Sequence, residues 1–315
     1  MGSFGWMDRL RHLARRHPFL YRLRYALILR LDDYPFLDPP VTGRAPDESA
    51  PADFLDIVER LGPFDGSFED AKRLAFDLSR DHPRGPGLGI SSVGALRAVY
   101  RAKHHGGAGV CSDYTQIFLG LCRAAGIPCR EWGLTSTLAR RGIGHALTEV
   151  FVEDLGSWVL LDPYLSVFAT TEGGETPLSM IEAIDLTTAG RRDSIEMRAI
   201  DDLAVPPDRR DGYVARYFEP GHLFFVLSNN DVFRQDRYLQ RFGFLPLPAR
   251  HLIMLVAGVY QRFHIYANEQ NRRFLTAEVA RSRRFLVGLA STGLLLVTGI
   301  AVLVGWVVSG SGLRN

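Results

Sequence analysis

The 315-residue sequence has little cysteine, little lysine and little net charge, and each shortage excludes a class of protein. Three cysteines, Cys111, Cys122 and Cys129, are too few for the disulfide framework of a small secreted domain, so we expect a reducing compartment. The 37 basic and 35 acidic residues leave a formal net charge of only +2. All but Lys72 and Lys103 of the basic residues are arginine. Because these charges are balanced and no helix-turn-helix, zinc-finger or RNA-recognition spacing occurs, we expect no nucleic-acid partner.

The N-terminal segment, residues 1–33, lacks the continuous apolar core and small-residue cleavage site of a secretory signal peptide. It instead mixes arginines with large apolar residues and is interrupted at Pro18. Such a basic amphipathic pattern is typical of helices that lie on a membrane face. The alternative is that its apolar side packs on the protein while its arginines are solvated, and the sequence leaves both open.

A long apolar run stands out near the C-terminus, over residues 285–308. Its 24 uncharged residues are enough to cross a hydrocarbon core of about 30 Å at about 1.5 Å per residue. We therefore expect one transmembrane helix, followed by a short tail at 309–315. Arg283 and Arg284 directly precede the run, whereas only Arg314 follows it. By the positive-inside bias, we expect a single-pass inner (plasma) membrane protein whose residues 1–284 face the cytoplasm.

Between these two ends, changes in composition divide the chain into a linker, a globular domain and a stalk. Residues 34–51 are rich in proline and aspartate without periodicity, which predicts a linker. The domain is expected at residues 52–245, and a helical stalk at 246–284 leads into the apolar run. Residues 166–245 are expected to include a rim or lid. Apolar spacing predicts a strand over residues 223–228 and helices over residues 52–61, 68–80, 91–104 and 231–242.

A further helix and three strands are predicted from Cys111 onward. Apolar residues at i, i+3, i+4 and i+7 predict a buried helix that ends at Gly126, just before Pro128. A helix followed by antiparallel strands predicts the α+β fold class. The three strands are expected at residues 129–134, 146–153 and 157–162, with a hairpin-like turn between the last two.

Cys111, His145 and Asp162 stand at the ends of these elements, where we expect a catalytic triad. A thiol attacks as the thiolate, and both a helix N-terminus and a neighbouring imidazolium favour that form. His145 is suited to act as general base and then as general acid, and Asp162 to fix its tautomer. Alone, each residue type more often serves as core, structural polar group or turn former. Their combination in this order is what favours catalysis.

Zinc binding is the other chemistry that cysteine and histidine offer. Cys122 lies eleven residues after Cys111, which is about 16 Å along a helix at 1.5 Å per residue. Two thiolates that share an ion at about 2.3 Å each cannot be so far apart. We therefore expect no metal and no cofactor, and we interpret Cys122 and Cys129 as core residues.

A resemblance to the transglutaminase-like superfamily rests on three segments, GAGVCSDYTQIFLGLCRAAGIPCREWG, GHALTEVFV and SWVLLDP. It covers residues 92–168 and places the family's catalytic residues at Cys111, His145 and Asp162. It implies a papain-like fold in which the cysteine helix packs on an antiparallel sheet. Ser112 stands where the animal cross-linking enzymes have tryptophan, and no acidic calcium-binding cluster is evident. The chain is therefore more similar to the bacterial cysteine peptidases and amidases of the superfamily.

These features predict a membrane-anchored cysteine hydrolase or acyltransferase that acts on a peptide or amide bond through a thioester. The expected partners are a peptide or protein substrate and the lipid around the C-terminal helix, with the basic N-terminal segment as a second candidate contact. An alternative from another class is a catalytically silent binding or assembly module of a membrane complex. A true transglutaminase would need only an amine in place of water as acyl acceptor.

Overall fold

The computed structural model describes most of the chain between residues 23 and 311. The predicted helix at 91–104, the glycine-rich approach to Cys111 and most of the basic N-terminal segment lie outside the described residues. The chain divides into two compact units. The larger consists of Asp32–Thr137 and Gly142–Tyr266. The described residues are 23, 25–32, 34–40, 47, 50–79, 109–136, 144–200, 207–219, 221–269 and 271–311.

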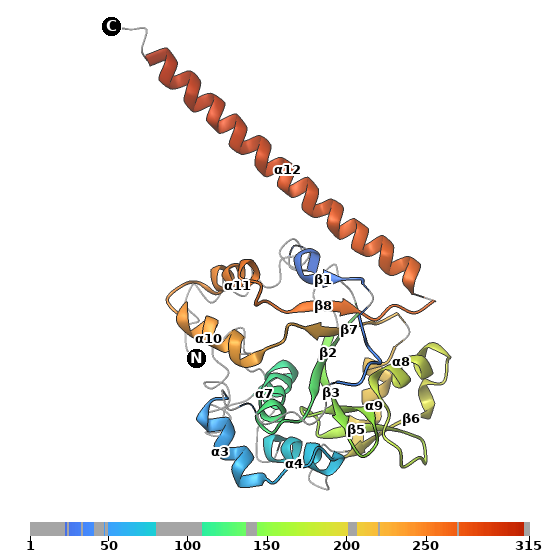
Figure 1. Cartoon of the computed structure of the whole chain (residues 1–315). Helices are drawn as coiled ribbons and strands as arrows, with labels where there is room; N and C mark the ends of the chain where they lie inside the picture. Colours follow the sequence, from blue (N-terminus) through green and yellow to red (C-terminus); the bar gives the residue numbers. More distant parts are fainter. Residues whose placement is uncertain are drawn as a thin grey trace, which may run out of the picture. The chain divides into compact units, whose positions relative to one another are not determined.

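The larger unit is built around an antiparallel sheet. Within this unit the strand order is β8-β7-β2-β3-β4-β5-β6 (Figure 1). All neighbouring strands in this order run antiparallel, as predicted for the three strands that follow Cys111. The strands are β2 (Cys129–Thr135), β3 (Gly144–Val152), β4 (Ser157–Asp162), β5 (Val167–Thr171), β6 (Ile195–Ala199), β7 (Leu223–Ser228) and β8 (Arg262–Ile265).

Helices of this unit cover both faces of the sheet. On one face α7 packs against β2 and β3, and α3, α4 and α10 pack against α7 (Figure 1). On the other face α8 and α9 join a second apolar core around Trp132 and Leu147. The central strand β3 is therefore buried on both faces, so that its polar residues Thr148 and Glu149 are buried together with its apolar ones. The helices are α3 (Ala52–Leu61), α4 (Phe68–Ser79), α7 (Cys111–Ala124), α8 (Met180–Thr188), η1 (Arg192–Ser194), α9 (Pro207–Tyr217), α10 (Val232–Arg241) and α11 (Leu247–Val256).

The helix α7 ends where the sequence predicts. Gly126 adopts a left-handed conformation, with φ of 78°, which glycine tolerates without steric cost. The N–H of Ile127 donates to the carbonyl of Cys122 at 2.8 Å, and the N–H of Gly126 donates to Arg123 at 3.2 Å. These two bonds form a Schellman motif, which satisfies helix carbonyls that have no partner within the helix. The chain then turns directly into β2.

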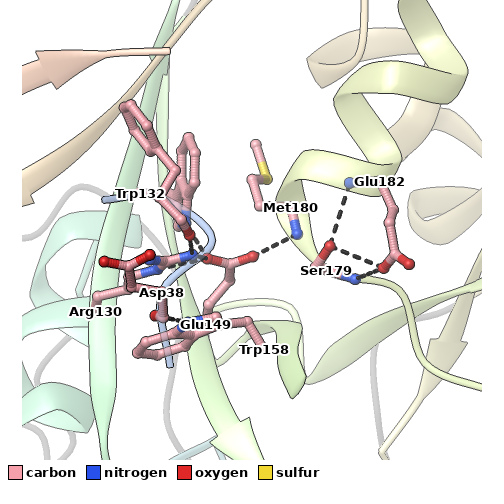
Figure 2. A network of polar contacts seen from close by, with 9 residues as sticks. Asp38, Arg130, Trp132, Glu149, Trp158, Ser179, Met180 and Glu182 are labelled. Carbon is pink, nitrogen blue, oxygen red and sulfur yellow. Dashed lines mark hydrogen bonds and ion pairs between the residues drawn. The ribbon is translucent and has the colours of Figure 1, made fainter. Parts of the chain in front are cut away.

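A buried carboxylate, that of Glu149 on β3, ties three elements together (Figure 2). Arg130 of β2 forms an ion pair with it at 2.7 Å, and the indole N–H of Trp132 donates to the same oxygen. The other oxygen accepts from the backbone N–H of Met180 at 2.5 Å. Since Met180 opens α8, the carboxylate also complements the positive end of that helix. The network fixes β2, β3 and α8 in one arrangement.

Part of the predicted linker, residues 34–51, is held against the sheet. Phe36 accepts a bond from Arg130 through its carbonyl at 2.7 Å and packs its ring near Trp132 and Tyr266. Just before it, Asp32 bonds Nδ1 of His264 at 2.6 Å. Proline and aspartate thus mark an irregular segment here, but not one that is free of the domain.

The segment predicted as a helical stalk, residues 246–284, is only partly helical. Between α11 and the C-terminal helix lies β8, which pairs with β7 from Phe225↔Ile265 to Ser228↔Arg262. A strand of four residues is too short to show a period in the sequence, so the sequence predicts a helical stalk that includes these residues. The residues up to Tyr266 belong to the larger unit.

The smaller unit contains β1 (Leu29–Arg30) and the 40-residue helix α12 (Arg272–Ser311). Within α12, the span Arg272–Val304 contains an 18-residue window with a mean hydropathy of 2.2. Among the described residues it is the one helix long and apolar enough to cross a membrane. The predicted α+β fold class and the apolar C-terminal helix are therefore confirmed.

Candidate active site

Cys111 is the first residue of α7, and its side chain is partly buried. The preceding residue, Val110, is extended and serves as the N-cap. Its N–H donates to the carboxylate of Asp113 at 2.9 Å, and the N–H of Asp113 donates back to the Val110 carbonyl at 2.9 Å. This pair of bonds fixes the backbone on both sides of Cys111. Helix N–H groups without an intrahelical partner are concentrated at this end, where they favour a negative charge.

His145 and Asp162 reach the site from neighbouring strands. His145 is the second residue of β3, and Asp162 is the last residue of β4. The pairing Thr148↔Leu161 puts both side chains on the same face of the sheet. Nε2 of His145 lies 2.6 Å from Oδ2 of Asp162, and the two side chains are 1% and 0% exposed.

The carboxylate of Asp162 is held at both oxygens. Oδ1 accepts from the backbone N–H groups of Tyr164 and Leu165, at 2.8 and 3.2 Å. Oδ2 is left for His145, whose Nε2 must carry the proton because an ionised carboxylate only accepts. Nδ1 of His145 is then the nitrogen that is free of Asp162, and Cys111 is near enough to contribute to the raised pKa of His145. This hydrogen bond favours the tautomer of His145 that carries its proton on Nε2.

The charges around His145 favour the imidazolium. Burial by itself would lower its pKa. The negative charge and hydrogen bond of Asp162, together with the hydrogen bond and charge of Cys111, outweigh burial and raise the pKa of His145 to about 10. A protonated His145 beside the thiol is the partner that a thiolate requires at neutral pH.

Three tyrosine rings contact His145, and none of them is predicted from the sequence to belong to the site. Tyr217 stacks on its ring at 4.3 Å with an interplanar angle of 15°, while Tyr213 and Tyr164 make edge contacts at 5.7 and 6.2 Å. Burial and the nearby charge of Asp162 raise the pKa of Tyr213 well above its usual value. Burial raises the pKa of Tyr217 to about 12. Both phenols are therefore neutral near pH 7.

The sequence contains a signal for one of these tyrosines but not for the other two. Tyr164 comes two residues after Asp162, and its position next to a candidate catalytic residue is a usable signal. Tyr213 and Tyr217 come from α9, more than fifty residues further along the chain, within a segment of low overall apolar content. Only the packing of α9 on this face of the sheet brings them to His145.

The two other cysteines lie away from the site, at the far end of α7. Cys122 is fully buried in the apolar core, and Cys129 begins β2 beside it. Burial and the hydrogen bond with Cys122 raise the pKa of Cys129 well above its usual value. Cys129 is therefore a poor nucleophile at neutral pH, and full burial keeps Cys122 away from solvent. Among the described residues, no group of three or more His, Cys, Asp or Glu side chains is arranged to hold a metal ion.

One known family matches the part of the chain that contains these residues. The model of the transglutaminase-like superfamily matches residues 89–163, a range that contains Cys111, His145 and Asp162. No curated protein matches the chain. Residues 89–163 are thus the core of a transglutaminase-like domain, which this polypeptide combines with an apolar C-terminal helix.

Proposed function

We propose that the protein is a membrane-anchored cysteine hydrolase or acyltransferase that acts on a peptide or amide bond through a thioester on Cys111. The observation that carries the proposal is the buried hydrogen bond of 2.6 Å between His145 and Asp162, next to a cysteine at a helix N-terminus. The raised pKa of His145 adds to it, because an imidazolium stabilises the thiolate.

The reaction we propose has two steps. In the first, the thiolate of Cys111 attacks the substrate carbonyl, and the C–N bond breaks as His145 passes its Nδ1 proton to the leaving amine. The backbone N–H groups at the start of α7 are suited to stabilise the oxyanion that forms on the way. In the second step, neutral His145 takes a proton from water, which attacks the thioester and releases the acid and the thiolate. An amine in place of water would give acyl transfer by the same route.

The membrane anchor in this proposal is α12. Its apolar part is long enough to span a bilayer, and many of its large apolar side chains, such as Leu295 and Trp306, are exposed. Such side chains are costly in water and stable in lipid. The arginines before the apolar run favour a cytoplasmic transglutaminase-like domain.

Substitution of each triad residue tests the catalytic part. The purified full-length protein would be incubated with a peptide library, and cleaved or transferred products would be measured by mass spectrometry. We expect Cys111→Ala and His145→Ala to lower turnover by about 10³-fold or more, and Asp162→Asn by about 10²-fold, with unchanged circular dichroism. Cys129→Ala, which alters a cysteine outside the site, is the matched control.

Two outcomes would contradict the proposal. Full activity in Cys111→Ala would show that Cys111 is not the nucleophile. A wild-type protein that is folded, releases no product and alkylates at Cys111 no faster than an ordinary thiol would favour the catalytically silent binding module.

A further inference from the structure

One face of α10 presents a row of arginines to solvent. Arg234, Arg237 and Arg241 are all exposed, and their spacing of three and four residues places them on one side of the helix. The opposite side buries apolar residues such as Phe233 and Leu239. The helix is thus strongly amphipathic, with a cationic outer side.

The acidic residues of this segment do not neutralise the row. Asp231 caps α10 through the N–H of Arg234 and pairs with Arg123 at 3.1 Å. Asp236 is buried and accepts a bond from Gln240 at 2.6 Å. Within the part of the chain that the structure describes, no carboxylate pairs with any of the three arginines. Their positive charge is therefore available to a partner.

Large apolar side chains are exposed immediately after this helix. Phe244, in the turn between α10 and α11, is 81% exposed. The guanidinium of Arg250 holds that turn by donating to the carbonyls on either side of Phe244, at 2.8 and 2.7 Å. On α11, Leu252 and Val256 are 59% and 82% exposed and lie four residues apart, hence on one side of the helix. Exposed apolar groups next to arginines are the composition of an interfacial membrane-binding element.

We propose that α10, α11 and the turn between them form a docking surface for an anionic lipid bilayer. The two helices pack against each other, so the arginines and the apolar residues belong to one part of the domain (Figure 1). The arginines would bind acidic headgroups, while Phe244, Leu252 and Val256 enter the boundary of the acyl chains.

Charge decides between a bilayer and the other possible occupants. A second copy of this surface would bring two rows of arginines together. The basic N-terminal segment, with seven arginines in its first 30 residues, would be repelled in the same way. Anionic lipid is the occupant that complements both the charge and the apolar residues.

The inference rests on the proposed membrane anchoring. Only residues 257–271 separate α11 from α12, so the anchor would keep the surface near a bilayer at high effective concentration. Weak docking is then sufficient to give the domain one orientation on the membrane, which would limit the substrates that reach Cys111.

Photocrosslinking of the full-length protein in lipid nanodiscs tests the proposal. The photoreactive residue p-benzoylphenylalanine would replace Phe244 or Leu252, Val297 within α12, or Leu155 as an exposed leucine in the β3–β4 turn. In nanodiscs that contain phosphatidylglycerol, we expect lipid adducts by mass spectrometry at positions 244, 252 and 297, and none at 155. An adduct at 297 without adducts at 244 and 252 would contradict the docking surface but not the membrane anchor. No adduct at 297 would instead contradict the anchor.

Charge reversal tests the role of the arginines. Arg237→Glu/Arg241→Glu should lower the adduct yield at position 244 by about fivefold per arginine at low salt, to the level found in phosphatidylcholine alone. The matched control, Arg191→Glu/Arg192→Glu in the turn after α8, should leave the yield unchanged. The proposal would be contradicted if the two double variants lowered the lipid adduct yield at position 244 equally. It would also be contradicted by protein–protein adducts at 244 in place of lipid adducts.

Discussion

At the scale of single residues, the environment of His145 determines what the site can do. Asp162 holds one ring nitrogen, the ring of Tyr217 stacks on one face, and Cys111 contributes to the raised pKa of the ring. A carboxylate and an aromatic face both stabilise a cation more than a neutral imidazole. The site is therefore organised around a charged histidine.

Replacement of Tyr217 should change the titration of His145. We expect Tyr217→Leu to lower the pKa of His145 by about 0.5 to 1.5 units, because the stacked ring no longer stabilises the imidazolium. Tyr217→Phe keeps the ring and should leave the pKa unchanged. Titration of the His145 ring proton by NMR measures both variants. Equal shifts in the two would show that the hydroxyl, and not the ring face, is responsible.

The raised pKa of His145 also predicts how stability depends on pH. A group with a pKa near 6.5 in the unfolded chain and about 10 in the folded protein contributes stability that is complete below about pH 6.5. This contribution is lost as the pH rises through 10. Wild-type protein should therefore lose free energy of unfolding between about pH 7 and pH 10.5 relative to His145→Gln, as measured by urea denaturation. Parallel pH profiles of the two proteins would contradict the charged state of His145.

At the scale of elements, the sequence predicted the part of the fold that carries the candidate triad. The helix from Cys111 has a strong period, and the strands β4 and β7 contain continuous apolar runs that follow Gly156 and Gly221. The strands β2 and β3 begin directly after Pro128 and at Gly144. The short strands β5 and β6 were not predicted, because VFATT does not alternate and IEMRA alternates over only five residues, which is a weak signal. The triad residues follow from the order of elements, whereas Tyr213 and Tyr217 depend on long-range packing that a local pattern does not encode.

The Glu149 network is the element-scale feature most open to test. Glu149→Gln removes the charge from a buried ion pair and leaves Arg130 without its counter-ion, so we expect a loss of about 3 kcal/mol in the free energy of unfolding. The double variant Arg130→Met/Glu149→Leu removes both charges and should recover part of that loss. Denaturant unfolding of the three proteins measures the difference. If Glu149→Gln left the free energy of unfolding unchanged, the network would not be what holds β2, β3 and α8 together.

At the scale of the whole molecule, the apolar helix and the flanking arginines predict the topology. Arg281, Arg283 and Arg284 lie just before the apolar run, so the transglutaminase-like domain should face the cytoplasm. In intact bacterial spheroplasts, added protease should leave residues before 285 undigested, and permeabilised spheroplasts should show digestion as a control. Cleavage of the domain in intact spheroplasts would reverse the topology and move its substrates to the cell envelope.

The central claim is that Cys111 is a nucleophile kept reactive by His145, and its rate of alkylation tests this most directly. The full-length protein would be treated with iodoacetamide between about pH 6 and pH 9, and modification of each cysteine followed by peptide mass spectrometry. We predict that Cys111 reacts at a nearly constant rate across this range, at least about 10²-fold faster at pH 6.5 than in His145→Ala, while Cys122 and Cys129 stay unmodified. A Cys111 rate that rises about tenfold per pH unit in both proteins, as for an ordinary thiol, would contradict the account.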